Sequence, residues 1–219
     1  MTKVTCEISM SLDGFVAGRN PTLENPLGEG GELLHEWVVR LASWRERHGL
    51  EGGERNADDE LFTESLRRTG AHVMGRKMFS GGEGPWEDDP NADGWFGDDP
   101  PFHDPVFVLT HHAREPVAKQ GGTTYTFVTD GITSAVEQAR AAADGKDVLV
   151  AGGADVIQQA LTAELVDTLL IHVAPVLLGG GTRLFERPGG GVLTLEAPTV
   201  IASSNVTHLE FRIPEGGTR

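Results

Sequence analysis

The chain has 219 residues, of which 38% are hydrophobic, so it can bury the core of one ordinary domain. Its formal net charge of −15 argues against nucleic acid and anionic membrane surfaces as partners, because both repel acidic proteins. No apolar run approaches the roughly 20 residues of a membrane helix, and nothing at the start resembles a signal peptide. The single cysteine, Cys6, cannot form an internal disulfide, which fits a reducing cytoplasm. We therefore expect a cytoplasmic protein.

The first third of the chain is predicted to contain one strand and two helices. Val4–Met10 is rich in apolar and β-branched residues and is predicted to form the first strand. Ser11–Gly18 follows as a loop whose Gly and Asp residues suit turn geometry. Leu33–Arg47 carries apolar residues on one helical face, and Asp59–Thr69 has an acidic first turn, with Gly70 at its end. Both segments are predicted to be helices.

The remainder alternates short apolar runs with helical patterns. Strands are predicted at Ala71–Met74, Pro105–Leu109, Thr126–Thr129, Val148–Ala151 and Thr168–Val176, then at Val192–Ala197 and Asn205–Ile213. A capping-box pattern at Ser134–Glu137 opens a helix that ends near Gly145, and a further helix covers Val156–Leu161. Val148–Ala151 is apolar on both faces, which is typical of a parallel strand covered by helices. We expect an α/β sandwich with antiparallel strands at its C-terminal edge.

One segment concentrates the negative charge. Between Glu83 and Asp104 there are eight acidic residues and no Lys or Arg. The segment is also rich in Pro and Gly, so it is predicted to be a loop insertion at about residues 83–104 within a single domain spanning residues 1–219. A ligand that carries phosphate is expected to bind elsewhere, where the cationic side chains lie.

Three turns follow predicted parallel strands, namely Gly75-Arg-Lys, Thr110-His-His and Ala151-Gly-Gly-Ala-Asp. Open α/β sheets bind their ligands at the carboxyl ends of such strands. Glycine lets the backbone approach a ligand closely, and the unpaired N–H groups of the following helix attract phosphate. A tight strand-to-helix connection without any ligand would carry the same Gly-Gly pair.

Together with Ser11–Gly18 and Leu170–Phe185, these turns make the chain resemble the dihydrofolate reductase superfamily. Within it, the chain is most similar to the reductase domain of bifunctional riboflavin-biosynthesis enzymes, over Val4 to Ile213. The resemblance implies a dihydrofolate reductase-like three-layer sandwich with a mostly parallel central sheet. It also implies that NADPH is the cofactor and that hydride passes to a C=N or C=O bond of a small heterocyclic or ribosylamino-pyrimidine substrate.

The resemblance also implies a cofactor site. The Gly75 turn matches one whose amides and cationic side chain contact phosphate, although Arg76 alone could equally form a surface salt bridge. The Thr110 loop matches the loop that binds the adenosine 2′-phosphate, where His112 or Arg114 would supply the positive charge. The Gly-Gly turn matches the turn that binds the pyrophosphate. Ser9 and Ala17 match positions near the nicotinamide ring. The full set is Ser9, Ala17, Gly75, Arg76, Lys77, Thr110, His111, His112, Arg114, Ala151, Gly152, Gly153, Ala154, Asp155 and Val156.

The sequence does not identify the proton donor. Asp13, Glu36 and Glu83 are the candidate acids, although Asp13 matches a loop-stabilising Asp. We expect a proton relayed by water, with the acidic segment closing over the substrate as a lid and no single indispensable acid.

Several alternatives stay open. Dihydrofolate reductase activity is disfavoured, because Glu36 is only a loose match to the folate-site carboxylate. A non-catalytic NADPH-binding or sensing protein would keep the same fold. A metal enzyme built on His103, Asp104, His111 and His112 lacks typical ligand spacing, and we expect no metal. The zinc deaminase signature is absent, so a riboflavin role does not follow from the reductase part alone.

We also expect a homodimer. The apolar run Leu169–Leu178 and the late strands carry more hydrophobic surface than a sheet edge should leave bare. The remaining expected partner is the small-molecule substrate.

Overall fold

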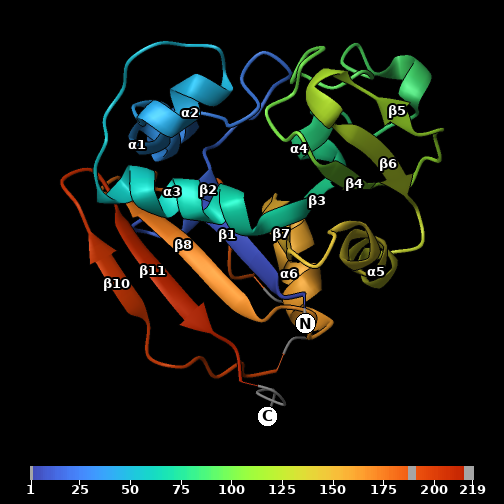
Figure 1. Ribbon diagram of the computed structural model, residues 1–219. Coiled ribbons are helices and arrows are strands. Elements are labelled where there is room, and N and C mark those ends of the chain that lie inside the picture. Colours follow the sequence, from blue (N-terminus) through green and yellow to red (C-terminus); the bar gives the residue numbers. More distant parts are fainter. Residues whose placement is uncertain (1, 187–190, 215–219) are drawn as a thin grey trace. The chain divides into compact units, whose positions relative to one another are not determined.

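The computed structural model describes residues 2–186 and 191–214, which form two compact units (Figure 1). The first unit combines Met1–Cys6 with Thr69–Val166, and the second combines Glu7–Arg68 with Asp167–Arg219. Strand β1 (Val4–Ser11) begins in the first unit and ends in the second. The single domain expected over residues 1–219 stays a prediction, and its residues 1, 187–190 and 215–219 lie outside the described part.

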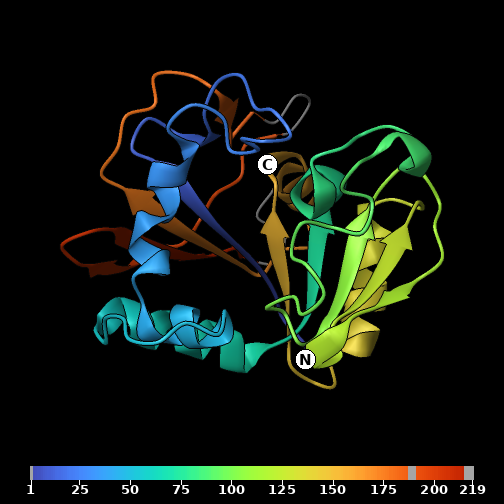
Figure 2. The same cartoon turned by 90° about the horizontal axis from the view of Figure 1, so that it is seen from above.

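The first unit is a parallel α/β sheet. Its elements after β1 are β3 (Thr69–Gly75), α4 (Arg76–Ser80), η2 (Trp86–Asp88), β4 (Pro105–Leu109), β5 (Val117–Ala118), η3 (Gln120–Gly122), β6 (Thr124–Val128), α5 (Ile132–Ala142), β7 (Asp147–Gly152) and α6 (Ala154–Thr162). The strand order is β1-β7-β3-β4-β6-β5, and only β5 runs antiparallel to its neighbour. Strands β3, β4 and β6 run side by side in both views (Figure 2).

The core of this unit follows from the apolar strands. Val148 and Val150 of β7 are fully buried between β1 and β3, as expected for a parallel strand covered on both faces. Next to β3, an aromatic cluster surrounds Phe79, whose ring meets Tyr125 at 4.9 Å and Phe127 at 5.4 Å, both edge to face. Such rings bury large apolar areas, so they hold α4 against β4 and β6.

The second unit is antiparallel at its C-terminal side. Its elements are β2 (Phe15–Ala17), η1 (Gly31–His35), α1 (Glu36–Val39), α2 (Ala42–Arg47), α3 (Ala57–Arg68), β8 (Thr168–Ala174), β9 (Thr182–Arg183), β10 (Thr199–Ala202) and β11 (Thr207–Arg212), together with the end of β1. The order is β10-β11-β8-β1, with a separate β2-β9 ribbon, and β10, β11 and β8 pair antiparallel. Helix α3 lies along this part of the sheet (Figure 1). The predicted α/β class, with a mostly parallel sheet and antiparallel C-terminal strands, is confirmed.

The single helix predicted over Leu33–Arg47 is wrong. The structure has three short helical pieces instead, broken where Leu41 adopts an extended conformation with ψ of 142°. At this break the N–H of Ala42 donates to the carbonyl of Glu54 at 2.9 Å, and the N–H of Glu54 donates to the carbonyl of Arg40 at 2.8 Å. These long-range backbone hydrogen bonds replace the intrahelical ones. The helical spacing of apolar residues therefore continues across the break at Leu41, but the helix itself does not.

Three further boundaries differ from the prediction. The strand expected at Val192–Ala197 lies instead at β10, because the antiparallel register with β11 requires the strand to adjoin the turn between them. The helix expected to open with a capping box at Ser134 begins earlier, at Ile132 after Gly131, and the Ser134 hydroxyl accepts from Gln138 at 3.1 Å. Gly70 belongs to β3, which starts directly after α3.

Candidate functional site

The carboxyl ends of three neighbouring parallel strands of the first unit lie in register. Gly75 of β3 is opposite Leu109 of β4, and Met74 is opposite Gly152 of β7. The turns that follow these strands therefore start at one edge of the sheet, as the sequence predicted. This is the edge at which open α/β sheets bind ligands.

The Gly-Gly turn presents bare backbone in front of a helix. Gly153 is exposed, and a Cβ added there would meet nothing within 4 Å. Its carbonyl receives the first intrahelical bonds of α6, from the N–H groups of Val156 and Ile157, both at 3.2 Å. The N–H groups of Ala154 and Asp155 come before these donors, so they are the ones that could receive an anion. The Gly152–Gly153 peptide bond is cis.

Two glycines in this region are required by the backbone or by packing. Gly152 has φ of +123°, a conformation that L side chains rarely adopt. At Gly75, an added Cβ would lie 2.9 Å from Cγ2 of Val156. Glycine at this position lets the start of α6 pack against the end of β3, which brings the first and third turns together. Asp155 is exposed in the first turn of α6, where a negative charge stabilises the helix dipole.

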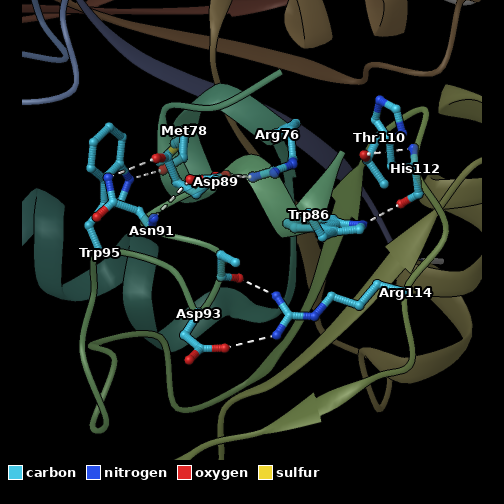
Figure 3. A network of polar contacts seen from close by, with 12 residues as sticks. Arg76, Met78, Trp86, Asp89, Asn91, Asp93, Trp95, Thr110, His112 and Arg114 are labelled. Atoms are coloured by element: carbon cyan, nitrogen blue, oxygen red, sulfur yellow. Dashed lines mark hydrogen bonds and ion pairs between the residues drawn. The ribbon is translucent and has the colours of Figure 1, made fainter. Parts of the chain in front are cut away.

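Arg76 is a buried ion-pair partner rather than a surface residue. Its side chain is 7% exposed, and its Nη1 lies 2.5 Å from Oδ2 of Asp89, whose side chain is 2% exposed (Figure 3). The guanidinium also donates to the Ser80 hydroxyl and lies 3.5 Å from the centre of the Trp86 ring. Burial lowers the pKa of Arg76, but the ordinary value is so high that the group stays charged.

Asp89 is held in place from several sides. The Ser80 hydroxyl donates to its Oδ2 at 2.7 Å, and the backbone N–H of Asn91 donates to its Oδ1 at 2.8 Å. Burial by itself would raise the pKa of Asp89, but these hydrogen bonds and the charge of Arg76 hold it below its ordinary value. Asp89 is therefore an ionised partner that neutralises Arg76.

Two nitrogen atoms of Arg76 are left over. Its Nε and Nη2 are buried and have no hydrogen-bond partner among the described residues. Buried donors without partners are costly and rare, and guanidinium nitrogens suit phosphate oxygens. The neighbouring Lys77 is exposed and forms an ion pair with Glu83, so it lies at the surface of the same turn.

The loop after β4 is tied to the acidic segment. Thr110 is buried, and its hydroxyl accepts from the N–H of His112 at 3.2 Å. The carbonyl of His112 accepts from Nε1 of Trp86 at 2.8 Å, and His111 is exposed. Arg114 donates to the carbonyl of Ala92 and lies 2.8 Å from Asp93 (Figure 3). Thus both arginines expected to face phosphate contact carboxylates from residues 86–93.

Sequence reasoning missed the residues that make these contacts. Ser80, Asp89, Asn91 and Asp93 carried no motif, and the only signal was an acidic segment directly after a cationic turn. That signal predicts attraction, but it does not say which carboxylate meets which arginine.

The edge of the first unit fits a nucleotide cofactor. It offers an open Gly-Gly backbone, the first N–H groups of α6, a partly exposed Arg114, and two Arg76 nitrogens that have no partner within residues 2–186 and 191–214. All four features suit phosphate groups, which take N–H and guanidinium donors.

The other predicted site residues lie in the second unit. Ser9 is buried and accepts from Nε1 of Trp37 at 3.1 Å, and Ala17 lies in β2. The carboxylate of Asp13 accepts from Ser11 at 2.6 Å, from the N–H of Leu178 at 3.1 Å and from that of Gly179 at 2.7 Å. The Ser11 bond is the main reason why its pKa is lowered. These are the contacts of a loop-stabilising Asp.

The remaining acid candidate, Glu36, lies on the surface of α1. It is paired with Arg40 at 3.3 Å, and more than half of its side chain is exposed. Such a pair contributes little to stability, and nothing about it distinguishes a catalytic acid.

Sequence analysis also missed a buried polar cluster in the second unit, formed by Glu7, Asp58, His172 and His208. Nδ1 of His172 lies 2.7 Å from Nδ1 of His208. Nε2 of His208 lies 3.0 Å from Asp58, and Nε2 of His172 lies 3.1 Å from Glu7. The Trp37 ring packs against both imidazoles, at 4.6 and 5.0 Å between centroids. The cluster joins β1, α3, β8 and β11.

The hydrogen bonds of this cluster constrain its protons. One Nδ1 atom must donate and the other must accept, while both Nε2 atoms face carboxylates and donate. Burial, followed by the charge of His172, lowers the pKa of His208. Burial by itself would raise the pKa of Glu7, but the hydrogen bond and charge of His172 hold it below its ordinary value.

The alternative of a metal centre is not supported by the arrangement of the candidate ligands. Within residues 2–186 and 191–214, no group of three or more His, Cys, Asp or Glu side chains is arranged to hold a metal ion. His103 lies 3.9 Å from Asp99, and Asp104 lies 3.7 Å from His72. In the same part of the chain, no helix has the length and apolarity to cross a membrane.

The parallel sheet with antiparallel C-terminal strands, and the three turns at one edge, define a protein of the dihydrofolate reductase-like class. A family model described as the RibD C-terminal domain matches residues 2–209, so the chain belongs to that family.

Known structures share the fold at low sequence identity. A Shewanella sp. PV-4 protein, provisionally assigned to riboflavin biosynthesis, is 24% identical with a TM-score of 0.60, covering 97% of this chain and 99% of that one. The riboflavin biosynthesis reductase Rib7 of Saccharomyces cerevisiae is 16% identical with a TM-score of 0.52, covering 97% and 89%. The uncharacterised protein YyaP of Bacillus subtilis strain 168 is 24% identical over 189 residues, 84% of this chain and 80% of YyaP. At these identities the structural likeness shows the fold alone.

Proposed function

We propose that the chain is an NADPH-dependent reductase that transfers a hydride to a small heterocyclic or ribosylamino-pyrimidine-type substrate. The observation that carries the proposal is the register that aligns the Gly75, Thr110 and Gly152 turns at one sheet edge. Membership of the RibD C-terminal domain family supports the same reading. Rib7, which shares the fold, is named as a riboflavin biosynthesis reductase.

The residues of the edge divide the task of holding the cofactor. The amides of Ala154 and Asp155 at the open Gly-Gly turn would receive the pyrophosphate. The unpartnered nitrogens of Arg76 would donate to a phosphate oxygen, and Arg114 would supply charge for the 2′-phosphate. When bound, the nicotinamide ring supplies the hydride, and the protein positions it and keeps water away.

The protein must also deliver a proton. Each candidate acid is already engaged: Asp13 in its loop, Glu36 with Arg40 and Glu83 with Lys77. The lowered pKa of Asp13 further makes it a poor acid near neutral pH. We therefore keep a proton relayed by water as the working mechanism.

Calorimetric titration of NADPH into the protein tests the binding step. Arg76→Ala removes charge-assisted hydrogen bonds and is expected to weaken binding by roughly 10- to 100-fold. Because Arg76 is buried, thermal unfolding must show that the variant folds, and Arg76→Lys serves as the variant that keeps the charge. An unchanged dissociation constant in a folded Arg76→Ala variant would remove this residue from the site.

Turnover is tested by following the loss of NADPH absorbance with pterins, pyrimidines and lumazines. Steady oxidation with one of these supports the reductase. Tight NADPH binding without turnover on any of them favours a nucleotide-binding protein, and oxidation with a dihydropterin alone favours dihydrofolate reductase activity. No NADPH binding contradicts the proposal.

A further inference from the structure

The acidic segment occupies both cationic groups of the candidate site. Asp89 is paired with Arg76, and Asp93 is paired with Arg114 (Figure 3). The Trp86 ring lies between them, 3.5 Å from the Arg76 guanidinium carbon and 5.1 Å from that of Arg114. Residues 86–93 therefore put two carboxylates where the proposed function needs phosphates.

The two ion pairs differ sharply in burial. The Arg76 and Asp89 side chains are 7% and 2% exposed, and Asp89 is further fixed by Ser80 and Asn91. In contrast, the Arg114 and Asp93 side chains are 22% and 80% exposed. Separating a buried pair leaves an uncompensated charge, whereas an exposed pair contributes little and exchanges readily. The Asp89 contact is therefore permanent, and the Asp93 contact is exchangeable.

Arg114 has its outer nitrogens in use. One donates to the carbonyl of Ala92 and the other contacts a single carboxylate oxygen of Asp93. A phosphate monoester carries about two negative charges and three acceptor oxygens, so it matches the guanidinium fork better than one carboxylate oxygen. Such a group would displace Asp93, which can turn out into solvent.

We propose that Asp93 is an internal competitor for the 2′-phosphate of the cofactor at Arg114, and so a specificity-determining residue for that cofactor. The proposal rests on the proposed function for the identity of the ligand. Binding of NADPH exchanges the Asp93 contact for a phosphate contact, whereas NADH, which lacks the 2′-phosphate, leaves the Asp93 contact in place. Asp93 thus lowers the affinity for NADPH and leaves the affinity for NADH unchanged.

The test compares Asp93→Asn with the wild type by calorimetric titration of NADPH and NADH at low salt. Because an exposed pair is worth roughly 0.2–1 kcal/mol, Asp93→Asn is expected to bind NADPH about 1.5- to 5-fold more tightly, with NADH unchanged. Asp88→Asn is the matched control, since Asp88 is an exposed carboxylate of the same segment and its loss changes the net charge equally. It should change neither affinity.

A double-mutant cycle isolates the contact from the general charge. Arg114→Gln should weaken NADPH roughly 10- to 100-fold, and Asp93→Asn should then have no further effect. Equal NADPH affinity in the wild type and Asp93→Asn, or an equal gain for NADH or in Asp88→Asn, would overturn the role of Asp93 while leaving the reductase proposal intact.

Adenosine 2′-monophosphate serves as a probe that does not depend on the whole cofactor. If NADPH does not bind but this probe binds more tightly to Asp93→Asn in an Arg114-dependent way, the phosphate site stands and the proposed function fails. If neither NADPH nor the probe binds to any variant, both are overturned.

Discussion

The buried histidine cluster of the second unit offers the sharpest test of the structure. Asp58 and His208 are each 1% exposed and lie 3.0 Å apart, and Nδ1 of His208 lies 2.7 Å from Nδ1 of His172. His208→Leu would leave the Asp58 carboxylate buried without its donor, which is expected to cost about 3–5 kcal/mol of unfolding free energy. His208→Gln keeps one donor and one acceptor, so its cost should be nearer about 1–2 kcal/mol.

The same residue makes stability depend on pH. Burial holds the pKa of His208 below its ordinary value of 6.5. Just below pH 6.5, His208 is therefore protonated in the unfolded chain but stays neutral in the folded protein. Stability from this source is present above pH 6.5 and is lost as the pH falls below it, by up to about 1.4 kcal/mol per pH unit. Burial also lowers the pKa of His35, which therefore acts in the same direction. Glu7, whose pKa lies below its ordinary value of 4.5, adds a further loss of stability as the pH falls below 4.5.

Urea unfolding at a series of pH values measures both effects. In His208→Gln the part of the slope due to His208 should disappear, while the His35 part remains. His111→Gln, a substitution of an exposed histidine, is the control and should leave the slope as in the wild type. If His208→Gln unfolds with the wild-type slope below pH 6.5, the assignment of a neutral His208 is wrong. If His208→Leu costs less than about 1 kcal/mol, the cluster is not a buried hydrogen-bonded unit.

Three further predictions concern the rest of the molecule. Asp89→Ala leaves the Arg76 guanidinium buried and without its carboxylate, so urea unfolding should show a loss of about 3–5 kcal/mol in the free energy of unfolding. Glu83→Ala breaks an exposed pair and should cost under about 1 kcal/mol. Similar losses in the two variants would refute the contrast between the buried and the exposed pair. Replacing Asp13, Glu36 and Glu83 one at a time should lower turnover modestly, and a single variant that binds NADPH but does not turn over would identify the acid. Light scattering should give a dimer of 23.4 kDa subunits, driven by exposed apolar side chains such as Leu177 and Val200, because Leu169, Leu170 and Ile171 of β8 are buried within the chain; a monomer mass would contradict it.

Local patterns in the sequence determined the architecture. The apolar runs of β4 and β7, the acidic start of α3 and the glycines at the strand ends carry signals that depend only on near neighbours. Backbone conformation and hydrophobic periodicity act over a few residues, so most strands, helices and turns could be read directly, although the break at Leu41 and the position of β10 could not. The alignment of three turns at one edge followed from the parallel sheet alone.

The structure was needed wherever a polar side chain found a distant partner. Asp58 and His208 are separated by 150 residues, and Glu7 and His172 by 165, yet they form one buried network. The local sequence around a buried His or Asp does not differ from that around an exposed one, because burial depends on the distant elements that pack over the residue. For the same reason the sequence could place cations at the phosphate edge, but only the tertiary structure decided that Asp89 neutralises one of them inside the protein and Asp93 covers the other at its surface.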